Sequence, residues 1–184
     1  MTSVAKLFNN PENSDLTIFK GDHEIHAHKC ILFSACPILK EKLDEEYEDT
    51  INLPENIRYT SFLEFLQYIY DVNYDVNNDN IHNLFYISGK YDCVELKEKC
   101  IEFMKKNLTY INSIFLLKEY EKHDFSEREE CIKLLMSNLQ DVVEETSFNS
   151  TVLKCLTSEE FHNLVYAYNE SDFKTDTLDQ KIIK

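Results

Sequence analysis

The chain contains very little glycine and proline: two and three residues, respectively, in a total of 184. An all-β protein needs many tight turns, which are built largely from these two residues. Their scarcity excludes an all-β architecture and favours a chain rich in helices. Hydrophobic residues make up 43% and aromatic residues 12%, so we expect a packed core and not extensive disorder. The length fits one domain or two small ones.

Positive charge is scarce as well. The chain has 19 lysines and arginines against 34 aspartates and glutamates, which gives a formal net charge of −15. Phosphate backbones and anionic lipid surfaces repel such a chain. The densest basic run, residues 97–106, is interleaved with glutamates at helical spacing and forms no basic stripe. We therefore expect neither nucleic acid nor a membrane surface as a partner.

Long apolar runs are absent too. No stretch approaches the ~20 apolar residues of a membrane span, and residues 1–10 show no apolar signal-peptide core. The six cysteines include no Cys-x-x-Cys pair, so without an export signal we expect reduced thiols and a protein of the cytoplasm or the nucleus. Cys93 and Cys100 are interpreted as small core residues, with a redox pair as the alternative.

The segment His26-Ala27-His28-Lys29-Cys30 raises the question of a metal site. On a strand, His26, His28 and Cys30 share one face because side chains alternate. If a helix starts at Lys29, however, Cys30 leaves that face, and a convincing fourth ligand is lacking. We therefore interpret His28 as structural and expect no metal. With no glycine-rich phosphate loop and no recognised nucleophile setting, we also expect no cofactor and no enzyme activity.

Apolar periodicity predicts a mixture of strands and helices in the first part of the chain. Alternation predicts short strands at 15–19 and 24–28, joined by a turn in which Gly21 supplies a positive φ. From Lys29 the period becomes helical and continues to Leu43. A third short strand is predicted at 49–53.

The remainder of the chain is predicted to be almost entirely helical. The predicted helices cover residues 59–69, 81–88, 93–108, 114–120 and 126–143, with a last one starting at Thr157. The first ~110 residues are therefore predicted to be α+β and the rest all-α.

Several stretches carry family motifs, in order, along the first hundred residues. They are Ser14-Asp15-Leu16-Thr17-Ile18, then His28-Lys29-Cys30-Ile31-Leu32-Phe33-Ser34-Ala35-Cys36-Pro37, then Tyr68-Ile69-Tyr70, and Ser88-Gly89-Lys90-Tyr91 through Leu96 and Cys100. Together they resemble the BTB/POZ domain, with Cys36 where its H-K-x-x-L-x-x-x-S signature usually has serine. Residues 107–165 are similar to a BACK segment. The resemblance implies a BTB/POZ fold, a small β-sheet flanked by helices, over 1–108, followed by a partial BACK (3-box) helical region over 109–184.

The resemblance also implies a function. BTB proteins that recruit cullin-3 carry a hydrophobic-x-Glu motif in a loop, and the nearest match here is Tyr47-Glu48-Asp49, with Asp in place of Glu. Their BACK start extends the groove that holds the cullin's N-terminal arm. The expected function is therefore that of a cullin-3 ubiquitin-ligase adaptor, a protein-binding subunit without catalysis. The expected cullin-binding residues are Leu43, Tyr47, Asp49, Ile114 and Leu117.

A second interpretation is a homo-oligomeric scaffold, or a competitor that binds other BTB proteins without recruiting cullin-3. It is favoured by the absence of a kelch, MATH, zinc-finger or ankyrin-like segment that would bind a target. An ion-channel-type or elongin-like relative fits less well, because those lack a BACK-like continuation. In either case the resemblance implies a homodimer formed by the N-terminal helix and the helix from Lys29. The expected interface residues are Val4, Leu7, Phe8, Ile31, Leu32 and Ile38.

Overall fold

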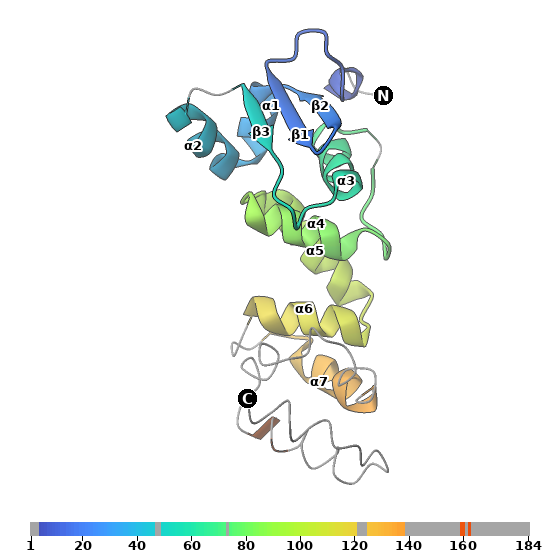
Figure 1. Cartoon of the computed structure of the whole chain (residues 1–184). Helices are drawn as coiled ribbons and strands as arrows, with labels where there is room; N and C mark the ends of the chain where they lie inside the picture. The colour runs from blue at the N-terminus through green and yellow to red at the C-terminus, as the bar shows by residue number, and fades with distance from the viewer. Residues whose placement is uncertain are drawn as a thin grey trace. The chain divides into compact units, whose positions relative to one another are not determined.

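The computed structural model describes residues 4–46, 49–72, 74–120, 125–138, 159–160 and 162, with the exception of the side chains of 42–46. The chain divides into two compact units, Met1–Phe103 and Met104–Lys184 (Figure 1). Each unit is described by itself below. None of the described helices is long and apolar enough to cross a lipid bilayer.

Three short strands form the sheet of the first unit, and they lie side by side in the order β2-β1-β3 (Figure 1). Strand β1 (Leu16–Lys20) pairs antiparallel with β2 (His23–Ala27), and it pairs parallel with β3 (Thr50–Asn52). The turn between β1 and β2 contains Gly21 with a φ of 59°, as predicted. All three predicted strands are confirmed, and each end differs from the prediction by one residue.

The sheet buries one set of alternating side chains. Leu16 and Ile18 of β1 are 2% and 0% exposed, and Ile25 and Ala27 of β2 are both 0% exposed. Ile18 lies directly opposite Ile25 in the antiparallel register, so the two apolar rows meet on the same face of the sheet. This period of two is the pattern from which the strands were predicted.

The predicted continuous helix from Lys29 is in fact two helices, α1 (Lys29–Ala35) and α2 (Pro37–Glu46). Cys36 separates them with a φ of −134° and a ψ of 82°, outside the helical region. The ring of a proline pushes the preceding residue towards extended backbone. Pro37 has no N–H, which is harmless at the first position of a helix. The dipeptide therefore ends α1 and starts α2.

Three further described helices follow in the first unit, and the last of them ends three residues into the second unit. They are α3 (Tyr59–Ile69), α4 (Ile81–Lys90) and α5 (Val94–Lys106), preceded at the N-terminus by the 3-10 helix η1 (Val4–Leu7). Phe62 and Phe65 of α3 and Tyr91 after α4 form an aromatic cluster with ring centroids 5.5, 6.0 and 6.2 Å apart. All three side chains are at most 3% exposed, and burial of such a ring stabilises the fold by roughly 1.5–3 kcal/mol.

The second unit contains helices α6 (Tyr110–Tyr120) and α7 (Arg128–Ser137), which pack against each other. The guanidinium of Arg128 donates to both carboxylate oxygens of Glu160, at 3.0 and 2.8 Å. Glu159 and Glu160 are helical; the rest of the helix predicted from Thr157 lies outside the described residues apart from residue 162. The architecture is therefore α+β followed by a helical continuation, as the sequence predicted.

Candidate functional site

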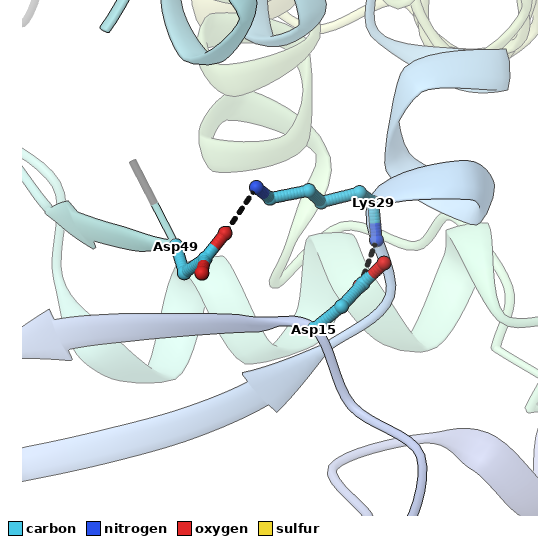
Figure 2. Close-up of polar contacts among 3 residues, drawn as sticks. All are labelled: Asp15, Lys29 and Asp49. Carbon is cyan, nitrogen blue, oxygen red and sulfur yellow. Dashed lines mark hydrogen bonds and ion pairs between the residues drawn. The ribbon is translucent and has the colours of Figure 1, made fainter. Parts of the chain in front are cut away.

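Lys29 joins α1 to the starts of two neighbouring strands, as Figure 2 shows. Its backbone N–H donates to Asp15 Oδ1 at 2.7 Å, and its ammonium pairs with Asp49 Oδ1 at 2.5 Å. Asp15 directly precedes β1 and Asp49 directly precedes β3. Because β1 and β3 are parallel, both carboxylates come from the same end of the sheet.

The two carboxylates contribute differently to the fold. Asp15 satisfies an N–H in the first turn of α1, where backbone donors have no partner within the helix. Asp49 forms an ion pair in which its own side chain is 80% exposed and that of Lys29 is 23% exposed. Exposed pairs of this kind contribute roughly 0–1 kcal/mol because water screens them. Asp49 is therefore accessible at the surface, although its charge already has a partner.

The other residues expected to bind cullin-3 fall into two groups. The side chain of Leu43 and the whole of Tyr47 lie outside the described residues. Ile114 and Leu117 of α6 are 4% and 0% exposed. These two side chains present almost no surface in this structure, and their contact with a partner stays a prediction. An apolar stripe on a helix can face either a partner or its own core, and here α6 packs against α7.

His28 links the junction of β2 and α1 to the residue that follows α3. Its backbone N–H donates to Tyr70 Oη at 2.8 Å, and its ring Nδ1 lies 3.1 Å from the same oxygen. His28 is 5% exposed and Tyr70 is 0% exposed. Burial raises the pKa of Tyr70 to about 12, although the hydrogen bond from His28 lowers it. Tyr70 therefore remains a neutral phenol that can accept from the N–H and donate to the ring, so His28 has a structural role.

The segment that suggested a metal site does not keep its three side chains together. His26 lies in β2, His28 is buried against Tyr70, and Cys30 is exposed on α1. Within the part of the chain that the structure describes, no group of three or more histidine, cysteine or acidic side chains is arranged to hold a metal ion.

The five cysteines among the described residues carry free thiols. The thiols of Cys36 and Cys93 share a hydrogen bond, which together with burial raises the pKa of Cys36 above its ordinary range. Burial also raises the pKa of Cys100 to about 12. Cys93 acts electrostatically on Cys100 as well as on Cys36, so the alternative of a Cys93–Cys100 redox pair stays a prediction.

The residues expected at a dimer interface differ in how far their side chains are exposed. Leu32 is 0% exposed and belongs to the core of the protomer. Phe8 packs its ring edge-on against Tyr70, with centroids 6.0 Å apart. Val4 is 36% exposed, whereas the side chains of Leu7, Ile31 and Ile38 are partly exposed. Whether these four contact a second copy stays a prediction.

A sequence model of the BTB/POZ domain matches residues 4–108. The chain is 27% identical to BTB/POZ domain-containing protein 19 of Bos taurus over 112 residues, which are 58% of this chain and 38% of that protein. It is 25% identical to human Kelch-like protein 2 over 178 residues, which are 92% of this chain and 28% of that protein. Kelch-like protein 41 of Mus musculus is 23% identical over 108 residues, 56% of this chain and 18% of that protein.

A solved structure of the BTB (Tramtrack and Bric a brac) domain of human Gigaxonin is similar with a TM-score of 0.45 at 28% identity, covering 50% of this chain and 78% of that chain. The chain spans at most 38% of the length of the three curated relatives above. The match to Kelch-like protein 2 extends beyond the BTB/POZ region into the helical continuation. Since the family model covers more than half of the chain, this protein belongs to the BTB/POZ domain family and is a protein-interaction module.

Proposed function

We propose that this protein is an adaptor that binds cullin-3 in a ubiquitin ligase and works without catalytic residues of its own. The observation that carries the proposal is the similarity to human Kelch-like protein 2 over 178 residues, 92% of the chain. That similarity includes both the BTB/POZ region and the helices that follow it. An adaptor needs two binding surfaces on one chain and no active site.

The proposed contact surface is centred on Tyr47 and Asp49. A buried aromatic anchor carries ~2 kcal/mol or more of a typical interface, whereas acidic residues at its rim carry little. The role of Tyr47 rests on the family motif, since this residue lies outside the described part of the chain. Asp49 supplies the acid of the motif with a side chain one methylene shorter than glutamate, and a partner would have to compete with Lys29 for it.

Calorimetry with the N-terminal domain of cullin-3 tests the proposal on the full chain. Tyr47→Ala should weaken binding roughly thirtyfold, which corresponds to ~2 kcal/mol at ~1.4 kcal/mol per decade. Glu45→Ala is the matched control and should leave the affinity nearly unchanged. If the intact chain shows no binding, the adaptor proposal is rejected.

The alternative is a self-associating scaffold, or a competitor that binds other BTB proteins without recruiting cullin-3. The observation that favours it is the engagement of the Asp49 carboxylate by Lys29 at 2.5 Å. Sedimentation of Val4→Asp/Leu7→Asp against the unmodified chain tests self-association, and a dimer should become a monomer. Phe8 is left unchanged because it packs against Tyr70 within the protomer. Self-association without cullin-3 binding would favour this alternative.

A further inference from the structure

A hollow of about 290 Å³ opens on the first unit, between the segment after β3, the start of α3 and helix α4. Its polar lining residues are Asn56, Arg58, Ser61, Asn83 and Tyr86, and two buried isoleucines complete it. The chain carries 34 acidic residues, yet no acidic residue among those that the structure describes lines this hollow. The lining therefore favours an anion over a cation.

Arg58 is the charged residue of the lining. Among the described residues its guanidinium has no ion-pair or hydrogen-bond partner, in contrast to Arg128, the other arginine of the chain, which binds Glu160 with two hydrogen bonds. A guanidinium presents paired N–H donors that match the two oxygens of a carboxylate. Arg58 is thus free to bind an acidic group.

The start of α3 adds a second source of positive potential. Arg58 is the N-cap residue of this 11-residue helix, and no side chain caps its first turn. The N–H groups of a first turn have no partner within the helix, and the helix dipole places partial positive charge there. Both effects stabilise a negative group in the hollow.

Ser61 adds a neutral hydrogen-bond donor to the wall of the hollow. The residue is 6% exposed, and its hydroxyl has no hydrogen-bond partner within the described part of the chain. Among the described residues, the buried side-chain polar atoms that lack a partner are His28 Nε2 and Glu127 Oε2, so the Ser61 hydroxyl still reaches solvent through the hollow. It can therefore donate to an acceptor oxygen that enters the hollow.

The rim of the hollow is also suited to a polypeptide. Tyr86 is 44% exposed, and its hydroxyl accepts a hydrogen bond from the Asn56 amide. The ammonium of Lys90 lies 5.9 Å from the centroid of the Tyr86 ring, so a second cation flanks the entrance. Exposed tyrosines are enriched where proteins bind other proteins.

We propose that this hollow binds a single acidic side chain of a partner polypeptide, with paired hydrogen bonds from Arg58 and a further one from Ser61. The volume is at the lower end of ligand pockets, which start at roughly 300 Å³, so it suits one side chain and not a folded element. A carboxylate carries less negative charge than a phosphate, which matters on a chain with a net charge of −15. The proposal rests on the protein-binding character of the family and is independent of cullin-3.

The test uses the full chain labelled with ¹⁵N-arginine, because its two arginines give only two Nε–Hε signals in an NMR spectrum. The probes are N-acetyl-Gly-Glu-Gly-amide, its glutamine counterpart and inorganic phosphate, all at constant ionic strength. The glutamate peptide should shift the Arg58 signal with saturation, while the Arg128 signal stays in place as an internal reference. The glutamine peptide should produce no saturating shift.

Two variants separate the hollow from general attraction to arginine. Ser61→Ala should weaken binding of the glutamate peptide about tenfold, which is the effect expected from the loss of one hydrogen bond to a charged group. Thr60→Ala, one residue away and outside the lining, should leave the affinity unchanged. Equal shifts with both peptides, a linear titration, or an unaffected Ser61→Ala variant would overturn the proposal. Saturation by phosphate alone would overturn it in favour of a phosphate site. Because no cullin is present, these outcomes do not depend on the proposed function.

Discussion

Replacing Tyr70 by phenylalanine should destabilise the first unit through a single lost hydroxyl. That oxygen lies 2.8 Å from the His28 N–H and 3.1 Å from His28 Nδ1, with both residues buried. The phenylalanine ring keeps the packing against Phe8, so the loss is confined to the two polar groups. Leaving a buried polar group without a partner costs roughly 1–3 kcal/mol. We expect the free energy of unfolding to fall by about 2 kcal/mol and the midpoint of thermal unfolding by roughly 10 °C.

The pH dependence provides a second signature of the same hydroxyl. The pKa of Tyr70 is raised to about 12, whereas a tyrosine in the unfolded chain titrates near 10. Between these values the unfolded chain binds fewer protons than the folded chain, so stability falls as the pH rises. A raise of about two pKa units corresponds to about 2–3 kcal/mol. The phenylalanine variant lacks this contribution, so its deficit relative to the unmodified chain should shrink from pH 8 towards pH 12.

Urea unfolding followed by circular dichroism at pH 8, 10 and 11 measures both effects. Tyr86→Phe is the matched control, because Tyr86 is 44% exposed and surface changes usually stay within about 0.5 kcal/mol. The reasoning is refuted if Tyr70→Phe unfolds at the same urea concentration as this control. It is refuted equally if the difference between variant and unmodified chain does not depend on pH.

Two further predictions follow from the other contacts. Asp15→Ala should lower the free energy of urea unfolding by about 1 kcal/mol, because a first-turn N–H of α1 loses its acceptor. Asp49→Ala should lower it by less, because the Asp49 side chain is 80% exposed. Equal losses for the two variants would contradict this ranking. In a mass-spectrometric alkylation of the folded protein at neutral pH, Cys30 should react first and the four other described cysteines slowly, because only Cys30 is exposed. Rapid alkylation of Cys100 would contradict the burial that raises its pKa to about 12.

The strands could be predicted from the sequence because burial of one sheet face leaves a period of two, as Ile18 and Ile25 show. The break between α1 and α2 was missed for a physical reason. Leu32, Cys36 and Leu39 are all buried, and their spacing of four and three is that of one continuous helix. Periodicity reports which side chains face the core and not whether the backbone between them stays helical. The proline after Cys36 was the signal that could have located the break.

The candidate site was less accessible to prediction because it depends on contacts between distant segments. The pairing of Lys29 with Asp49 requires the parallel register of β1 and β3, which no local pattern encodes. The burial of Ile114 and Leu117 depends on where α7 packs, so an apolar stripe alone left core and interface open. The hollow around Arg58 brings together polar residues of α3 and α4 that form no recognisable motif.

Asp49 contributes to the fold through its main chain more than through its carboxylate. Its carbonyl oxygen accepts the Thr17 N–H at 2.9 Å and extends the ladder between β1 and β3, whichever side chain the position carries. The carboxylate adds at most ~1 kcal/mol through the exposed pair with Lys29. The backbone N–H of Lys29 donates to Asp15 Oδ1 at 2.7 Å, and this hydrogen bond does not involve residue 49. The side chain at position 49 can therefore differ from the family's glutamate, or engage a partner, with little effect on the domain beneath it.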